Sequence, residues 1–230
     1  MTETKKEPIK YYWLNTPELF SEKYESDPTH FFSPASLFLN ARRKKVIQLA
    51  GKPKNKALLD VGCGSGIFML EFIKRGAKVT GVDYSKKMIE LARKLLEKYK
   101  IEKRYYKLMV SRASDLKFSA KSFDIILATG LIDYIPQKES EIFLEKSSKL
   151  LKKNGLIIVS FPSTKSPFAF LRKGIGLAIR RKFFHLPPIA HTFDKNQIEE
   201  MLERHGFKIV EISKIYSAMW IVKANLKQKL

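Results

Sequence analysis

The chain has 230 residues, of which 44% are hydrophobic, and it carries a formal net charge of +21. This composition excludes a disordered chain, and the length allows one α/β domain with a sizeable core. A single cysteine excludes an intramolecular disulfide, and no apolar run approaches the roughly 20 residues that span a bilayer. Because the first residues also lack the apolar core of a signal peptide, we expect a cytoplasmic protein.

The positive charge comes from 34 lysines and only 10 arginines, against 23 acidic residues. A field of this size attracts nucleic acid, anionic lipid or acidic ligands. Base recognition and bidentate phosphate binding favour arginine, so the lysine excess is more typical of a solvated surface. Nucleic acid is therefore kept as a partner that the composition does not favour.

Residues 1–50 are predicted to form an N-terminal segment, helical and rich in aromatic side chains, that covers a cleft or caps the sheet. Prolines break its first part into short pieces, and an amphipathic helix is expected over residues 37–49. Arg42 and Arg43 lie on that helix, where either could reach a cofactor carboxylate, an anionic acceptor or a surface ion-pair partner. Residues 51–230 are predicted to form the main domain.

A strand, a glycine-rich turn and a helix follow one another at the start of the main domain. Residues 57–61 form a short apolar run, which breaks into glycines at 62, 64 and 66 before a helical periodicity over 65–75. Glycine reaches positive φ at little cost and lets a ligand approach bare backbone. The unit therefore predicts a ligand site beside the N-terminus of a helix.

Strands and helices then alternate along the rest of the chain. Strands are predicted at 57–61, 78–82, 105–110, 123–128, 156–161, 207–213 and 216–223, and helices at 65–75, 85–99, 138–151 and 194–205. The pattern indicates a seven-stranded, mostly parallel, doubly wound α/β sheet, with a C-terminal hairpin that adds one antiparallel strand. Ser85 is the expected N-cap of one helix, and Thr192 or Asp194 that of the last. Ligands are expected beyond the carboxyl ends of the strands.

The glycine turn and two acidic residues resemble the cofactor motif of class I S-adenosylmethionine (SAM)-dependent methyltransferases. Asp60 stands two residues before Gly62, and Asp83 follows the next predicted strand. Dinucleotide sites instead read G-x-G-x-x-G, with glycine where this chain has Ile67. The resemblance covers most of the chain, from about residue 55 to residue 215. It implies SAM as cofactor, S-adenosylhomocysteine (SAH) as product, and 51–230 as the methyltransferase domain.

The resemblance also implies which residues contact SAM. Asp83 would accept hydrogen bonds from the ribose hydroxyls, Asp60 would hold the turn or accept from the cofactor ammonium group, and Asp115 would accept from the adenine amino group. The full set is Tyr24, Asp60, Gly62, Cys63, Gly64, Gly66, Asp83, Tyr84, Met88, Ser114, Asp115 and Thr129. Met88 could equally be ordinary helix core. For Asp115 the alternative is a loop cap.

A hydroxyl acceptor must lose a proton, and the candidate bases are His191 and Tyr134. His185 and His30 rank after these two as candidates. The alternative is a structural role, which is the more common one for a lone histidine. Cysteine-based methylation of pyrimidine carbon is excluded, because Cys63 stands in the cofactor turn.

The loop after the fourth predicted strand argues against a metal. Quinone-precursor O-methyltransferases that use a metal carry a Glu and a Glu-His pair in this loop. This chain has Gly130, Asp133 and Tyr134 there instead, so no metal is expected.

Residues 163–190 are predicted to be an insertion before the last helix, with apolar side chains interleaved with arginine and lysine. Such a stretch suits an anionic membrane surface or an anionic, partly apolar acceptor; the alternative is a packed lid with a solvated basic rim. The leading hypothesis is a methyltransferase acting on a small apolar or anionic acceptor, lipid-like or quinone-like, through oxygen. The alternatives are an RNA or protein methyltransferase and a SAM-binding protein without turnover.

Overall fold

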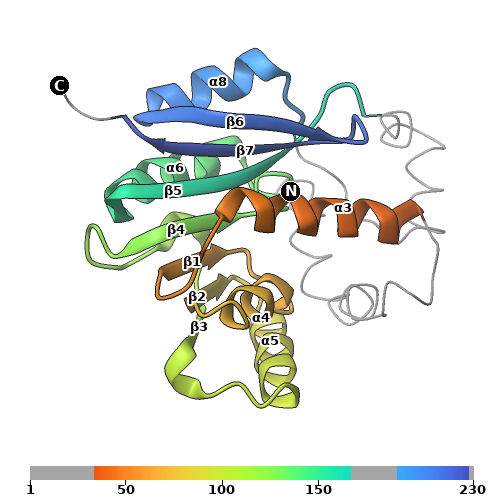
Figure 1. Cartoon of the computed structure of the whole chain (residues 1–230). Helices are drawn as coiled ribbons and strands as arrows, with labels where there is room; N and C mark the ends of the chain where they lie inside the picture. Colours follow the sequence, from red (N-terminus) through yellow and green to blue (C-terminus); the bar gives the residue numbers. More distant parts are fainter. Residues whose placement is uncertain (1–33, 167–190, 228–230) are drawn as a thin grey trace, which may run out of the picture.

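The computed structural model describes residues 34–166 and 191–227, which form a seven-stranded sheet covered by helices on both faces (Figure 1). The strands are β1 (Ala57–Val61), β2 (Lys78–Asp83), β3 (Tyr106–Val110), β4 (Phe123–Ala128), β5 (Leu151–Pro162), β6 (Phe207–Ile215) and β7 (Met219–Leu226). Residues 1–33 and 167–190, with Tyr24, His30, His185 and most of the predicted insertion, lie outside the described residues.

The strands are ordered β3-β2-β1-β4-β5-β7-β6 in the sheet. β3, β2, β1, β4 and β5 pair in parallel, whereas β7 pairs antiparallel with both β5 and β6. Tyr216 and Ser217 form the hairpin turn with φ of 44° and 55°, the backbone that suits the twist of two antiparallel strands. This topology confirms the predicted fold class. The chain order reverses between β1 and β4, where sheets of this kind open a ligand crevice.

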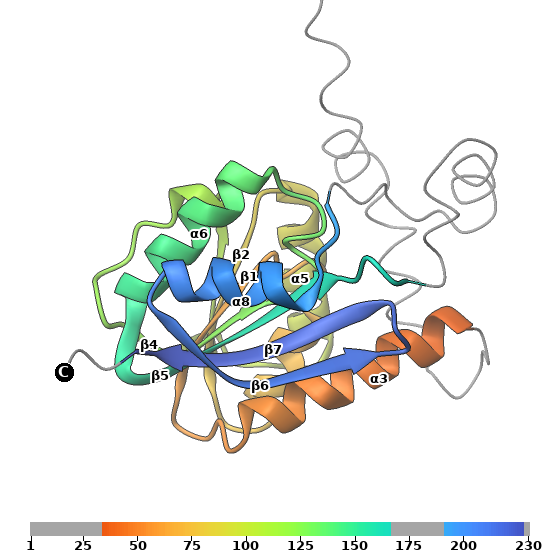
Figure 2. The same cartoon turned by 90° about the horizontal axis from the view of Figure 1, so that it is seen from above.

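Two hydrophobic cores hold the helices to the sheet. The helices are α3 (Pro34–Ala50), α4 (Ile67–Ile73), α5 (Lys86–Lys98), α6 (Gln137–Leu150) and α8 (Lys195–Arg204). α6 and α8 cover one face, and α3, α4 and α5 cover the other (Figure 2). No described helix combines the length and the apolar character that crossing a bilayer requires.

Local chemistry explains where the helices begin. Ser85 caps α5 by accepting a hydrogen bond from the Met88 amide at 3.3 Å. Asp194, rather than Thr192, caps α8 and forms a capping box with Gln197. α4 is shorter than the expected 65–75, because the left-handed Gly66 (φ 86°) precedes it and Gly76 (φ 85°) ends the turn that follows it.

β5 begins five residues earlier than its apolar run predicts. Leu151 pairs with Phe123, and a register shift between Phe123 and Ile125 accommodates the polar residues that follow. The periodicity of 156–161 indicated only the mostly buried part of the strand, because residues 152–154 before it are polar and half-buried or exposed.

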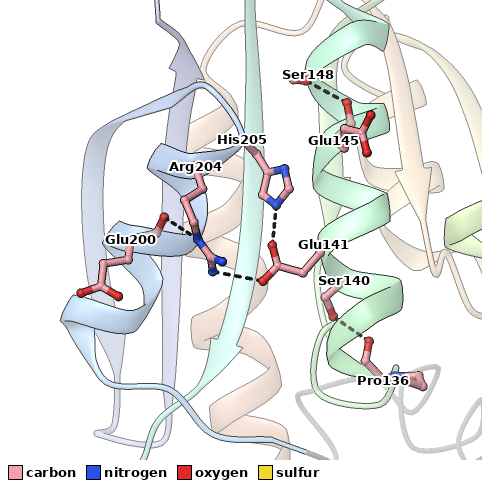
Figure 3. A network of polar contacts seen from close by, with 8 residues as sticks. All are labelled: Pro136, Ser140, Glu141, Glu145, Ser148, Glu200, Arg204 and His205. Atoms are coloured by element: carbon pink, nitrogen blue, oxygen red, sulfur yellow. Dashed lines mark hydrogen bonds and ion pairs between the residues drawn. The ribbon is translucent and has the colours of Figure 1, made fainter.

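A polar network ties α6 to the end of α8 on one face of the sheet (Figure 3). Glu141 of α6 accepts hydrogen bonds from Arg204 at 3.1 Å and from His205 at 2.5 Å. Arg204 also donates to the Glu200 carbonyl one turn earlier. His205 is therefore a structural residue that holds the two helices together.

Candidate functional site

The glycine turn after β1 is fastened to the end of β2 by backbone hydrogen bonds. The amides of Gly62 and Cys63 both donate to the Val82 carbonyl, at 2.7 and 3.1 Å. Gly62, Gly64 and Gly66 all have positive φ, at 73°, 53° and 86°. Such backbone favours glycine, which explains why the residue recurs at alternate positions.

The three glycines serve different purposes. A Cβ at Gly62 would lie 3.1 Å from Leu131, and one at Gly66 would lie 3.0 Å from Ala92, so both permit close packing. A Cβ at Gly64 would meet nothing within 4 Å. Gly64 therefore presents bare backbone to open space, as a turn must if a ligand is to lie against it.

Asp83, at the end of β2, joins the two strand ends through its carboxylate. One oxygen accepts from the Gly64 amide and the other from the Ser85 amide, both at 2.9 Å. Burial raises the pKa of Asp83, and the backbone N–H groups oppose that rise. A carboxylate presents about four acceptor sites, so Asp83 can still accept from a ligand beside the backbone N–H groups of Gly64, Tyr84 and Ser85.

Asp60 is a buried acid at the same edge of the sheet. Its side chain is 1% exposed, and among the described residues its Oδ2 has no hydrogen-bond partner. Burial and the charge of Asp83 raise the pKa of Asp60 to about 7, although the charge of Arg42 opposes the rise. A cationic ligand group would stabilise the ionised form of this buried carboxylate.

Arg42 and Arg43 are adjacent on α3, but their side chains make different contacts. Arg43 forms an ion pair of 3.8 Å with Glu71 of α4. Arg42 is buried, and its guanidinium lies 5.9 Å from the centre of the Phe68 ring. A Cβ at Gly130 would lie 3.1 Å from Arg42 Nη1, so α3 brings a cation to the end of β4. Of the two arginines, Arg42 is the one at the candidate site.

The other predicted cofactor residues take varied positions around this edge. Tyr84 is half-buried directly after Asp83, Met88 belongs to the core under α5, and Thr129 is buried at the end of β4. Cys63 is also buried, which raises the pKa of its thiol well above the usual range, so it is unsuited to act as a nucleophile.

The turn after β3 separates two of the predicted cofactor contacts. Ser114 is half-buried and donates to Glu139 at 3.3 Å. Asp115 ends the 3₁₀ turn η2 (Ala113–Asp115) and its side chain is exposed. The two neighbours therefore face different surroundings.

The candidate bases lie on separate segments. Tyr134 is half-buried in the loop between β4 and α6. His191 is half-buried two residues before Phe193, whose ring centre is 6.4 Å from that of His191. Phe193 forms a β-bridge with Ser163, which directly follows β5. His191 therefore also lies near the carboxyl ends of the strands.

Three residues at this edge were absent from the set predicted from sequence. Ser160 of β5 is buried and accepts from the Gly130 amide at 2.7 Å, which fixes the loop after β4. Glu139 of α6 accepts from Arg112 as well as from Ser114. A serine inside the apolar run of β5 was a visible signal, whereas the pairing of Arg112 with Glu139 has no local pattern.

These groups together fit one kind of ligand. A buried carboxylate and a buried guanidinium suit the ammonium and carboxylate of an amino acid, and the Asp83 carboxylate suits a pair of hydroxyls. Within residues 34–166 and 191–227, no group of three His, Cys, Asp or Glu side chains is placed to hold a metal ion.

Comparison with known sequences agrees with this chemistry. A family model described as a methyltransferase domain matches residues 58–155. The ubiquinone biosynthesis O-methyltransferase of Pelagibacter ubique is 32% identical over 200 residues, which cover 85% of this chain and 79% of that protein. The protein of the same name from Nitrosococcus oceani is 28% identical over 182 residues, or 77% of this chain and 74% of that protein.

Solved structures share the fold at low sequence identity. The magnesium protoporphyrin IX methyltransferase of Synechocystis with bound SAM aligns with a TM-score of 0.74 and 16% identity, covering 99% of this chain and 100% of that one. A SAM-dependent methyltransferase from Aquifex aeolicus aligns with a TM-score of 0.65 and 18% identity, covering 87% and 98%.

Proposed function

Because this chain belongs to the class I SAM-dependent methyltransferases, we propose that it methylates an oxygen atom of a small, apolar or anionic acceptor. SAM is the methyl donor and SAH the product. The proposed place of the donor rests on Asp83, whose carboxylate accepts hydrogen bonds from the amides of Gly64 and Ser85. Beside it, the backbone of Gly64 faces open space.

Different residues of the site would bind different parts of SAM. Asp83 would hold the ribose hydroxyls, and the backbone of Gly64 would lie against the methionine portion. Asp60 would face the ammonium group, and Arg42 the carboxylate. The proposal is supported by burial, because Asp60 and Arg42 are both buried, have side chains of opposite charge type and lie at the ends of the neighbouring strands β1 and β4.

The chemistry is an in-line displacement, in which the acceptor oxygen attacks the methyl group that SAM carries on its sulfonium sulfur. For that step the protein supplies alignment and exclusion of water. A neutral hydroxyl acceptor would also need a base, and Tyr134 or His191 is the candidate to remove the proton. A carboxylate acceptor would need none.

Oxygen is favoured over other acceptor atoms by the curated relatives. The proteins from Pelagibacter ubique and Nitrosococcus oceani are O-methyltransferases of ubiquinone biosynthesis, and the first covers most of this chain. A quinone precursor combines an acidic hydroxyl with an apolar body, which matches the small-molecule acceptor inferred from the sequence. We therefore propose a phenolic, quinone-like acceptor.

The test uses the full chain with radiolabelled SAM and a panel of phenols, hydroquinones and carboxylic acids, each with and without an apolar tail. We expect label in an organic product that mild alkali does not release, as for a methyl ether. Release by alkali would identify a methyl ester and a carboxylate acceptor. Label found only in RNA or protein pools of a cell extract would contradict the small-molecule proposal.

We propose that the protein is cytoplasmic and makes peripheral contact with an anionic membrane surface. The support for this proposal is the sequence of the insertion at 163–190, in which basic and apolar residues alternate. Sedimentation with neutral and with anionic vesicles distinguishes the cases, since membrane contact predicts recovery with the anionic vesicles only. The unfavoured alternative, RNA binding, predicts an affinity for RNA that falls steeply with salt.

A substitution at Gly64 tests where the cofactor lies. We expect Gly64→Ala to weaken SAH binding at least tenfold, because its Cβ would occupy the open space beside the turn. The left-handed backbone should cost the fold only about 1–2 kcal/mol. Calorimetry gives the affinity and urea unfolding gives the stability.

Gly206 is the matched control for that substitution. It also has positive φ, and a Cβ added to it would meet nothing within 4 Å, but it lies between α8 and β6. Gly206→Ala should lose similar stability and keep SAH affinity. Equal affinity in both variants would show that no ligand lies against Gly64.

A further inference from the structure

The placement of the SAM groups along the sheet indicates where the adenine would lie. Arg42 and Asp60 stand at the ends of β4 and β1, and Asp83 stands at the end of β2. The methionine portion, the ribose and the base follow one another along the SAM molecule, and the next strand in the sheet is β3. The segment after β3 is therefore next to the base, and the Ser111 amide ties it to the Asp83 carbonyl at 3.0 Å.

That segment has little structure of its own. Between β3 and β4 it contains only η2, a single turn of three residues. One turn of 3₁₀ helix does not hold its own conformation, since nucleation costs more than one hydrogen bond returns. Within the segment, the Ser111 hydroxyl donates to the carbonyls of Arg112 and Asp115, and further contacts that hold its shape come from a neighbouring element.

α6 supplies those contacts through one acidic side chain. Glu139, with 10% of its side chain exposed, accepts from Arg112 Nη2 at 3.0 Å through one oxygen and from Ser114 Oγ at 3.3 Å through the other. These two residues flank Ala113, so one carboxylate holds the turn on both sides. Lys146, two turns further along α6, donates to the Leu116 carbonyl at 3.3 Å.

We propose that Glu139 is a positioning residue for the adenine of SAM. It acts through Arg112 and Ser114, whose backbone it holds in the conformation that binds the base. The inference rests on the proposed function, since it presumes that SAM binds at the ends of β1 and β2.

The test is the variant Glu139→Gln in the full chain. The amide keeps an acceptor for Ser114 and the size of the side chain, but it loses the charge that pairs with Arg112. We expect SAH affinity, measured by calorimetry, to fall roughly tenfold. The KM for SAM should rise while kcat and the KM for the acceptor stay the same.

Base selectivity separates positioning from a general structural effect. S-inosylhomocysteine differs from SAH at the purine 6-position, so the ratio of the two affinities reports on how the base is held. A merely destabilising change would lower both affinities alike, whereas a displaced turn should lower the ratio. Lys146→Met is the control, because it removes the α6 contact that lies beyond Ser114, and it should keep the ratio.

The outcomes separate the inference from the proposed function. If the wild type binds SAH and Glu139→Gln binds it with the same affinity and selectivity, the positioning role is overturned and the function stands. If the wild type itself does not bind SAH, both fail. Should Glu139→Gln not fold, Arg112→Gln removes the same ion pair from the exposed partner and carries the same expectations.

Discussion

Replacing Asp83 with alanine is expected to reduce SAM affinity by two orders of magnitude or more. The carboxylate would hold both ribose hydroxyls, and each hydrogen bond to a charged acceptor contributes about 1.5–3 kcal/mol. The same substitution also frees the Gly64 and Ser85 amides, whose acceptors are the two oxygens of Asp83. The turn that faces the methionine portion therefore loosens together with the ribose contact. Calorimetric titration with SAH measures the loss.

Two variants make that experiment specific. Asp83→Asn keeps one acceptor oxygen and should lose less affinity than Asp83→Ala. Asp124→Ala is the control: its carboxylate also accepts a backbone hydrogen bond, from Ala57 at 2.8 Å, and one from Lys152 at 2.7 Å. Asp124 lies near the start of β4, at the opposite edge of the sheet, so its loss should affect stability and leave SAH affinity unchanged. An unaltered affinity in Asp83→Ala would remove the basis for placing SAM at this edge.

The sequence predicted the elements that depend on local patterns. The glycine turn, the caps at Ser85 and Asp194 and the alternation of strands with helices each have a short-range signature, and each corresponds to an element of the structure. The hairpin at β6 and β7 was likewise visible, because two apolar runs follow one another without an intervening helix. Errors occurred at boundaries, as at the start of β5, where partly exposed residues carry no periodicity.

The parts of the site that join distant segments were not predictable in the same way. Nothing in the periodicity of α3 distinguishes Arg42, which is buried at the end of β4, from Arg43, which pairs with Glu71 on the surface. The pairing of Glu139 with Arg112 spans 27 positions and has no spacing rule. Such contacts are set by how α3 and α6 dock on the sheet, so they require the three-dimensional structure.

Asp60→Asn is expected to remove the contribution of Asp60 to the pH dependence of stability in the ligand-free protein. The pKa of Asp60 is raised to about 7 by burial and by the charge of Asp83. An unfolded aspartate titrates near pH 4, so between about pH 4 and pH 7 the folded state holds a proton that the unfolded state has lost. Stability therefore falls as the pH rises through this window, by roughly 4 kcal/mol in total if the full shift is realised. Asparagine cannot ionise, so the variant should be the more stable protein at pH 8 and should lose that advantage below pH 4.

Ligand binding should show the opposite trend, and the two trends together identify the role of Asp60. If its carboxylate faces the cofactor ammonium group, the ionised form binds SAM better, so wild-type affinity should rise with pH up to about 7 and then level off. In Asp60→Asn the affinity should be lower at pH 8, by about tenfold, and nearly independent of pH. Urea unfolding and SAH calorimetry at pH 5, 6, 7 and 8 measure both quantities on the same samples. A variant whose two pH profiles run parallel to those of the wild type would show that Asp60 neither titrates in this range nor meets the ligand. A variant that changes only the stability profile would make Asp60 a support of the turn, the other role that its place before Gly62 allows.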